Sequence, residues 1–343
     1  MQSTAEARVL SGAALPGEDR QDVSLRPQRF EELVGQGDLV ANLKVFVRAA
    51  RERGEALDHI LLSGPPGLGK TTLAHLIARE LEVDLHVTSG PAIERKDLAG
   101  ILSHLKERDV LFIDEIHRMN AIVEENLYPA MEDFKFDLVL GGGPHARTIE
   151  MPLPRFTLIG ATTRTGLLTG PMRDRFGFTG RMAYYGAHEL EHVIKRSAQL
   201  LEIRCTEAGA RELATRCRGT PRIANRLLRR LRDFAEVDGD GVVDRDLAQH
   251  ALTRLGIDEC GFDEMDRRLL ETLVTKFGGG PAGIETLGAA MGEEPDTLEA
   301  VYEPFLLQEG FIQRTPRGRV ATQRAYERVG LPPPAAGGQG ALF

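Results

Sequence analysis

Residues 64–72 read Gly-Pro-Pro-Gly-Leu-Gly-Lys-Thr-Thr and match the pattern G-x-x-x-x-G-K-[ST] in full. An apolar run at 60–62 precedes this stretch, and a helical pattern over 73–78 follows it. Strand, glycine-rich loop and helix form the context in which this motif holds nucleotide phosphates. A Gly/Pro turn with a surface lysine is the alternative, but the flanking strand and helix both favour the motif. The stretch therefore predicts a P-loop in an α/β domain with a parallel sheet.

The residue types in this loop each suit one part of a phosphate site. Glycines such as Gly67 and Gly69 let the backbone curl so that successive N–H groups converge on a phosphate. Lys70 can reach the β- and γ-phosphates as a mobile point charge, and the helix that begins near it adds partial positive charge. The Thr71 hydroxyl is placed to bind Mg²⁺, which keeps oxygen ligands. The loop therefore predicts a nucleotide and Mg²⁺ as ligands.

Two carboxylates follow a second apolar run. Residues 109–117 read Asp-Val-Leu-Phe-Ile-Asp-Glu-Ile-His and predict a buried strand that ends in Asp114 and Glu115. Because the carboxyl ends of parallel strands face one crevice, these acids should face the P-loop. Asp114 suits the Mg²⁺ shell, and Glu115 suits polarising the water that attacks the γ-phosphate. A solvated strand end is the alternative, and the P-loop upstream argues against it.

A third apolar run and two arginines complete the candidate site. Residues 156–161 predict another buried strand, and the polar Thr163 beyond it would face the γ-phosphate. Residues 168–176 place Arg173 and Arg175 on a turn or short helix. These arginines could form structural ion pairs, or one could reach a nucleotide bound to a neighbouring subunit. A trans arginine stabilises charge on the transferring phosphoryl group.

Composition is that of a globular protein with two or three domains. The chain has 343 residues, 42% hydrophobic and 27% charged, and its net charge of −8 excludes a wholly basic surface but allows a local basic site. Three cysteines without a C-x-x-C pair predict reduced thiols in a cytosolic protein. We expect neither a membrane span nor a signal peptide, because no run approaches 18 apolar residues and no basic segment with an apolar core is found at the start.

Residues 136–151 predict a β-hairpin, with three glycines at 141–143 between two strand patterns. Its alternate polar positions do not suit the middle of a parallel sheet. The hairpin could project as a docking surface or lie as a local flap, and the pattern does not separate the two.

From about Tyr184 the pattern becomes helical. The stretch 188–192 reads His-Glu-Leu-Glu-His and matches the H-E-x-x-H of zinc hydrolases, with Glu212 as a possible third ligand. We interpret it instead as an exposed helix face, because the same helix carries a sufficient buried stripe. That stripe consists of Leu190, Val193, Ile194 and Leu201.

A later helix begins at the stretch 219–222, Gly-Thr-Pro-Arg. Thr220 is predicted as its N-cap and Pro221 as its first helical residue. Arg222 stands at the helix start, where a cation opposes the helix dipole and an anion such as the γ-phosphate would relieve the conflict. The arginines at 226, 229, 230 and 232 are expected on a solvated face.

The last part of the chain predicts a winged helix. Helical patterns over 265–277, 284–291 and 295–308 precede a strand, tight turn and strand over 311–320. Residues 310–328 hold five arginines (314, 317, 319, 324 and 328) against one acid, Glu327. This concentration predicts contact with a phosphate backbone. A solvated hairpin is the alternative.

Together these stretches resemble the RuvB family, the hexameric AAA+ motors that drive Holliday-junction branch migration in bacteria. The resemblance covers about 25–332 and implies an α/β P-loop AAA+ core with a parallel sheet, an all-α helical lid and a winged-helix head. It is carried by residues 61–74, 111–118, 124–133, 156–164, 171–177, 218–236 and 310–319. The expected divisions are a flexible tail at 1–22, the ATPase domain at 23–183, the lid at 184–255, the DNA-binding head at 256–332 and a flexible tail at 333–343.

The resemblance also implies roles for single residues. Leu25 and Arg26 would line the adenine site, with Tyr185 on its other side. Thr71 and Asp114 would bind Mg²⁺, Thr163 would be the first sensor, and Arg222 the second sensor. Arg175 would be the trans finger, with Arg173 as the other choice. The further positions implied for ATP are Gly67, Gly69, Lys70, Thr72, Glu132, Asp133 and Phe134. Those implied for DNA are Arg314, Arg317 and Arg319, while Pro295 replaces an arginine that relatives often carry.

The implied partners follow from the same resemblance. The hairpin at 136–151 would dock the junction-binding protein RuvA, with the resolvase RuvC in the wider complex. Six copies would form a ring around duplex DNA in the cytoplasm, acting in recombination, repair and the SOS response.

Two other functions share part of the sequence pattern. A transcriptional regulator that uses ATP as a switch would also combine a P-loop with a winged helix, but it needs base contacts. The helix at 295–308 holds no Arg, Lys, Asn or Gln before Gln308, which argues against base readout. A small-molecule kinase would explain the P-loop but neither the lid nor the head.

Overall fold

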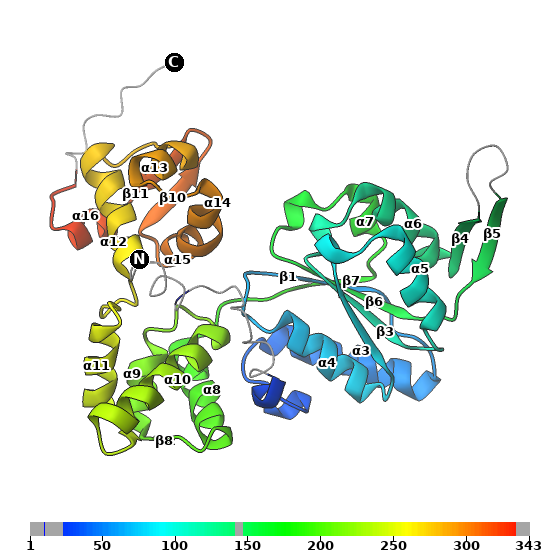
Figure 1. Cartoon of the computed structure of the whole chain (residues 1–343), viewed down its shortest axis with the longest axis horizontal. Helices are drawn as coiled ribbons and strands as arrows, with labels where there is room; N and C mark the ends of the chain where they lie inside the picture. The colour runs from blue at the N-terminus through cyan, green and yellow to red at the C-terminus, as the bar shows by residue number, and fades with distance from the viewer. Residues whose placement is uncertain (1–9, 11–22, 141–146, 334–343) are drawn as a thin grey trace. The chain divides into compact units, whose positions relative to one another are not determined.

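The computed structural model describes Leu10 and residues 23–140 and 147–333. The chain divides into two compact units, and we call the first, Arg20–Tyr185, the large domain. The second unit contains Gly186–Phe343. Within the described ranges, no helix is long and apolar enough to cross a membrane. Figure 1 shows both units and labels their elements.

The large domain is built on a five-stranded parallel sheet with the order β2-β3-β6-β1-β7. Strand β1 leads into the P-loop and pairs with β6, so that Ser63 lies opposite Thr162. Strand β3 pairs with β6 on the other side, and Asp114 is its last residue. The ends that carry the predicted site residues are therefore neighbours. The strands are β1 (Ile60–Ser63), β2 (Leu85–Ser89), β3 (Val110–Asp114), β6 (Thr157–Thr162) and β7 (Phe178–Arg181).

Helices cover both faces of this sheet. Figure 1 shows α3 and α4 on one face and α5 and α6 on the other. Helix α3 precedes β1, and α4 begins at Lys70 as predicted. The helices are α3 (Gly37–Arg53), α4 (Lys70–Glu80), α5 (Arg95–His104), α6 (Ala121–Glu132) and α7 (Gly170–Asp174). Short 3₁₀ turns lie at Val23–Leu25, Phe30–Glu32, Gly90–Ala92, Ile116–Arg118 and Thr165–Leu167.

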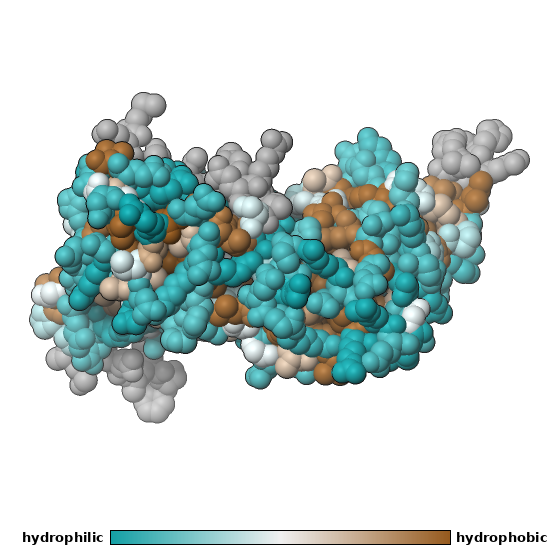
Figure 2. Space-filling model, turned by 90° about the horizontal axis from the view of Figure 1, so that it is seen from below, coloured by the Kyte–Doolittle hydropathy of each residue, from teal (hydrophilic) through white to brown (hydrophobic). Residues whose placement is uncertain are grey.

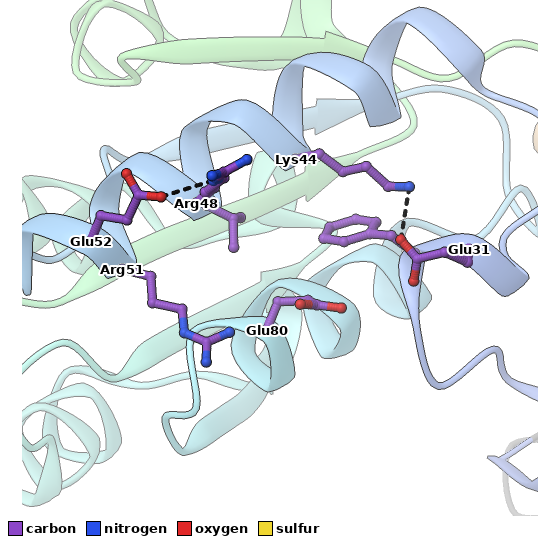
Figure 3. Close-up of a pocket in the computed structure, with 8 residues that line it drawn as sticks. Glu31, Lys44, Arg48, Arg51, Glu52 and Glu80 are labelled. Carbon is purple, nitrogen blue, oxygen red and sulfur yellow. Dashed lines mark hydrogen bonds and ion pairs between the residues drawn. The ribbon is translucent and has the colours of Figure 1, made fainter.

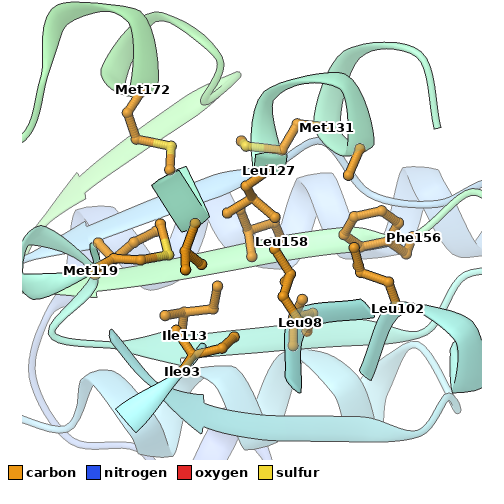
Figure 4. Packing of buried hydrophobic residues seen from close by; sticks show 14 of the residues in the cluster. Ile93, Leu98, Leu102, Ile113, Met119, Leu127, Met131, Phe156, Leu158 and Met172 are labelled. Atoms are coloured by element: carbon orange, nitrogen blue, oxygen red, sulfur yellow. The ribbon is translucent and has the colours of Figure 1, made fainter. Parts of the chain in front are cut away.

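A hydrophobic core fixes β3 and β6 against α5 and α6 (Figure 4). Leu98 of α5 and Leu127 of α6 pack there with Leu158 of β6, and all three are fully buried. Each buried leucine of this kind stabilises the fold by about 1.5–3 kcal/mol. The strand ends that carry the acids and Thr163 are therefore held by tight packing behind them.

The predicted hairpin is confirmed as β4 (Lys135–Leu140) and β5 (Arg147–Pro152), an antiparallel pair. Its glycines at 141–143 lie outside the described residues. Phe136 anchors the base of the hairpin in the core, whereas Ile149 is exposed. Figure 1 shows the hairpin projecting from the large domain, so it is not a flap folded over the sheet.

The second unit begins with the lid, which comprises α8 to α11. The expected all-helical pattern is interrupted by one two-residue parallel pair, β8 with β9. Arg226, expected on a solvated face, is instead buried. It lies on the same side of α10 as Ile223 and Leu227, and the helix presents that side to the lid core. The elements are α8 (Ala187–Leu200), β8 (Arg204–Cys205), α9 (Glu207–Ala214), α10 (Pro221–Asp238), β9 (Val242–Val243) and α11 (Arg245–Arg254).

The head, α12 to α16 with the hairpin between them, has the predicted winged-helix layout. The helix expected over 295–308 is present but contains a π-helical segment, Leu298–Tyr302. A second π segment, Thr272–Lys276, continues α12. A buried cluster that includes Phe262, Leu270 and Leu306 forms the core of the head. The remaining elements are α12 (Glu264–Glu271), α13 (Ile284–Met291), α14 (Pro295–Thr297), α15 (Glu303–Gln308), β10 (Ile312–Thr315), β11 (Gly318–Ala321) and α16 (Gln323–Val329).

Candidate nucleotide and nucleic-acid sites

The P-loop has the geometry of a phosphate cradle. Gly69, at the N-cap of α4, has φ 105°, and a Cβ at Gly64 would lie 2.8 Å from the carbonyl oxygen of Met182. A side chain at either position would therefore strain or block the loop. The Lys70 ammonium is buried and donates to the carbonyl oxygens of Gly64 (2.7 Å) and Pro65 (2.9 Å). Its charge thus lies over the loop itself.

The predicted acids and Thr163 meet at the end of the sheet. Asp114 accepts the backbone N–H of Glu115 at its Oδ1 (2.9 Å). Thr163 donates its hydroxyl to Oε2 of Glu115 (3.0 Å). The structure therefore brings together three residues that stand up to 49 positions apart, as the parallel-sheet argument predicts.

His117 also belongs to this cluster, although the sequence pattern predicted no role for it. Its Nδ1 lies 3.0 Å from Oγ1 of Thr162 and 3.2 Å from Oε2 of Glu115. Burial lowers the pKa of His117 against the opposing charge of Glu115, so the ring is neutral at pH 7. Its place two residues after Glu115 was the available signal.

The three residues implied for the adenine site, Leu25, Arg26 and Tyr185, all belong to the large domain. Tyr185 is buried and donates its hydroxyl to the carbonyl oxygen of Leu68 in the P-loop (3.2 Å). Leu25 is buried as well. Burial lowers the pKa of His75 on α4, and the nearby Arg26 guanidinium lowers it further. The chain before α3 therefore reaches the helix that follows the P-loop.

Arg175 is held by the end of α6. It donates to Oε2 of Glu132 (3.1 Å) and to the carbonyl oxygen of Pro171 (2.6 Å), and it lies over the Tyr128 ring (4.3 Å). Within one chain, Arg175 therefore forms a structural ion pair, which is one of the two roles that the sequence pattern left open. Arg173 is exposed. Phe134, also implied for ATP, packs edge-on against Phe156.

The second unit carries the other predicted positions. Arg222 lies in the first turn of α10, and Pro221 is its first residue as predicted. Thr220 occupies the N-cap position, but its hydroxyl donates to the carbonyl oxygen of Arg218 (3.1 Å) and accepts no helix N–H. The predicted N-cap position is therefore confirmed, but without a capping bond from its side chain.

The H-E-x-x-H stretch lies on α8. The rings of His188 and His192 are 4.7 Å apart, while Glu212 pairs with Arg216. In the part of the chain that the structure describes, no group of three or more His, Cys, Asp or Glu side chains could hold a metal ion.

Two of the predicted DNA-binding arginines share one carboxylate. Glu303, 1% exposed, accepts Nε and Nη2 of both Arg314 (3.1 and 2.8 Å) and Arg319 (2.8 and 2.9 Å). Glu299 adds a second carboxylate 3.1 Å from Arg314. The side chain of Arg314 stays 50% exposed, but that of Arg319 is only 12% exposed. Arg317, at the turn of the hairpin, is exposed.

Elsewhere, the large domain carries a pocket of about 510 Å³ between α3 and the end of α4 (Figure 3). Its charges are of both signs and partly paired, Lys44 with Glu31 and Arg48 with Glu52. It contains none of the predicted site residues. On the face in Figure 2, hydrophilic residues predominate and hydrophobic patches lie between them.

Comparisons with known proteins cover nearly the whole chain. The family of the Holliday junction DNA helicase RuvB P-loop domain matches residues 25–182. The RuvB AAA lid domain matches 185–258, and the RuvB C-terminal winged helix domain matches 259–330.

Similar proteins agree with these matches. The chain is 62% identical to the Holliday junction branch migration complex subunit RuvB of Myxococcus xanthus, over 98% of each chain. It is 56% identical to that of Rubrobacter xylanophilus, over 95% of each. A solved structure, the Thermotoga maritima RuvB Holliday junction branch migration motor, has a TM-score of 0.81 and 47% identity, over 90% of this chain and 99% of that one. This chain therefore belongs to the RuvB family of P-loop ATPases with an AAA lid and a winged-helix domain.

Proposed function

We propose that this chain is an ATP-hydrolysing motor that drives branch migration of Holliday junctions. The observation that carries the proposal is the cluster of Lys70, Asp114, Glu115 and Thr163 at one edge of the sheet, in a chain with RuvB similarity from end to end. Relatives with these domains are named as branch-migration subunits.

The residues at the sheet edge fit a nucleotide with Mg²⁺. The cradle admits no Cβ at Gly64, and a buried ammonium lies over it. Thr71 and Asp114 would supply the oxygen ligands that Mg²⁺ prefers. When bound, Mg²⁺ neutralises charge on the transferring phosphoryl group. Lys70 orients the phosphates, and the backbone N–H groups of the loop hold them.

Glu115 is the proposed general base. Its Oε2 already accepts the Thr163 hydroxyl, which leaves Oε1 to take a proton from water. Thr163 holds the carboxylate in one orientation, and a fixed base contributes about 10²–10⁴ in rate. Leu25, Arg26 and Tyr185 would bind the adenine end.

Neighbouring subunits would complete each site in a ring of six. Arg175, beside Glu132, Asp133 and Phe134, would face the nucleotide of the next copy, and Arg222 would sense it from the lid. The hairpin β4–β5 would dock RuvA, with RuvC joining the wider complex, and the chain would act in the cytoplasm. On the head, Arg317 and Arg314 would contact DNA phosphates. Arg319 stays a predicted contact, although its low exposure favours a supporting role.

The testing experiment is steady-state ATP hydrolysis with and without duplex DNA. We compare the wild type, Arg175→Ala, Glu115→Gln and a mixture of the two variants. We expect DNA to stimulate the wild type and each variant alone to be inactive. Recovery in the mixture would place Arg175 in trans, because intact sites form where Arg175 of one copy meets Glu115 of another. Arg173→Ala is the matched control and should stay active.

Full ATPase activity of Arg175→Ala, together with no stimulation by DNA, would refute the ring motor. The alternative would then be a regulator that uses ATP as a switch. Sequence-specific binding of the head to duplex DNA would support that alternative.

A further inference from the structure

A buried arginine joins the lid to the head inside the second unit. Arg218 lies in the turn between α9 and α10, is 5% exposed, and has φ 51°. Its side chain leaves the lid and enters the head. There Nε donates to the carbonyl oxygen of Gly261 (3.0 Å), and Nη2 binds the Asp266 carboxylate.

The head surrounds this guanidinium with groups of two kinds. Asp263 and Asp266, the capping pair at the start of α12, present carboxylates to Nη2, with Oδ2 of Asp263 at 3.3 Å. The ring of Phe305 on α15 lies 4.7 Å from the guanidinium carbon. One lid residue thus contacts both the first helix of the head and the helix before its wing.

The electrostatics of this cluster explain why the contact is strong. Breaking a buried ion pair by removing one partner leaves an uncompensated charge, which is far more harmful than losing a surface pair. Two acidic side chains face a single guanidinium here, and Asp266 is fully buried. Replacing all three ionisable side chains by neutral ones would leave no uncompensated charge behind.

The position of Arg218 in the sequence links it to nucleotide sensing. It stands four residues before Arg222, and the Thr220 hydroxyl between them donates to the carbonyl oxygen of Arg218. The turn that sets the start of α10 therefore also sets the head contact.

We propose that Arg218 is a positioning residue that fastens the head to the start of α10, so that nucleotide-driven movement of the lid is delivered to DNA. This inference rests on the proposed motor function. Without this contact, the lid would move without moving the head. ATP would still be hydrolysed, but fewer base pairs would migrate for each ATP.

Arg216 offers a matched control two residues away. It is also 5% exposed and also ion-paired, but its partner is Glu212 of α9 in the lid. That pair lines a pocket that Arg267 and Arg328 of the head also line, and removing it leaves the carboxyl groups of Asp263 and Asp266 in place. Both variants should affect folding to a similar extent, so a difference in coupling between them reports the head contact.

The experiment measures three quantities on the full-length chain with a junction-binding partner. They are the ATPase rate, the affinity for duplex DNA, and the number of base pairs migrated for each ATP hydrolysed. The test variant is Arg218→Met with Asp263→Asn and Asp266→Asn, which neutralises the whole cluster. The control is Arg216→Met with Glu212→Gln. A third variant, Arg218→Lys, keeps the charge but not the planar fork.

We expect the test variant to keep its ATPase rate and DNA affinity within about twofold. Its base pairs per ATP should fall by about fivefold or more. The control should keep the wild-type ratio, and Arg218→Lys should lie between the two. Migration per ATP equal to wild type in the test variant would overturn the proposal, as would a parallel fall of all three quantities. A wild type that hydrolyses ATP but migrates no junction would instead overturn the proposed function.

Discussion

The nucleotide site and the winged head use charge in opposite ways. In the large domain, the predicted residues turn toward one another: Thr163 bonds Glu115, and Lys70 lies over its own loop. In the head, predicted phosphate ligands turn toward carboxylates of the preceding helix. A motif set by local backbone can thus be recognised from its residues, whereas the net charge of a patch depends on neighbours supplied by folding.

Glu303 is the residue that makes this difference. Burial alone would raise the pKa of its carboxyl, but the Arg319 and Arg314 guanidiniums outweigh burial and hold the pKa below its usual value. The carboxylate therefore stays charged and cancels part of the basic hairpin. The five arginines of 310–328 overstate the positive charge that DNA would meet.

The largest effect should come from the nucleotide site. Glu115→Gln keeps the shape of the side chain but removes the base, so kcat for ATP should fall about 100-fold or more. Nucleotide affinity should persist because Lys70 and the loop are untouched. Steady-state hydrolysis and titration with a fluorescent nucleotide measure the two quantities.

Thr163→Ser is the control for Glu115→Gln, because serine keeps the hydroxyl that donates to the Glu115 carboxylate. Its kcat should stay close to wild type, whereas Thr163→Val should lower kcat. If Glu115→Gln hydrolysed ATP normally, another residue would have to be the base.

The next effect separates support from contact in the head. Arg319→Met removes one of the two partners of a buried carboxylate and should lower the free energy of unfolding by about 3 kcal/mol. Arg317→Met, at the exposed turn, should change it by less than about 0.5 kcal/mol. Hydrogen exchange of the peptides over 303–320 measures both. Equal protection in the two variants would contradict the support role of Arg319.

Acid should weaken the large domain before the head. His59 is buried, with Nδ1 accepting the N–H of Leu158 and Nε2 donating to the carbonyl oxygen of Met131. Burial lowers its pKa, so the unfolded chain binds the proton first. Its contribution is therefore complete above the unfolded pKa of about 6.5 and is lost as pH falls through the lower folded pKa.

A fall in pH has the opposite effect on the stability of the head. Residues 256–332 contain no histidine. Burial raises the pKa of Asp266 above its value in the unfolded chain, so the folded form binds the proton first and the contribution of this group to stability rises as pH falls. Hydrogen exchange at pH 7.5, 6.5 and 5.5, corrected for intrinsic rates, should show protection lost around β6 and kept around α12. Equal losses in both regions would contradict this difference.

The smallest effect concerns a single phosphate contact. Arg317→Ala should reduce the slope of log affinity against log salt for duplex DNA by about 1. Arg319→Ala should leave the slope unchanged in protein that remains folded. Fluorescence anisotropy over a salt series measures both, and a larger change for Arg319→Ala would reverse the two assignments.

Much of the nucleotide site could be predicted because its parts are local. The P-loop, the acids after β3 and Thr163 after β6 each follow an apolar strand, and parallel pairing places such strand ends together. His117 was missed because its place two residues after Glu115 is a weak signal that does not by itself predict a role in the site. Arg226 was misjudged because helical spacing alone did not show which arginine faces the lid core.

The sequence by itself determined the three-part architecture and the residues of the phosphate cradle, because glycine conformations, strand runs and helix starts are properties of neighbouring residues. Only the tertiary structure decided which arginines are available to DNA and which hold the molecule together. Glu303 stands 11 and 16 residues from its partners, and Arg218 stands 48 from Asp266. Ion pairs over such separations depend on how helices pack, and no local pattern of charge predicts that packing.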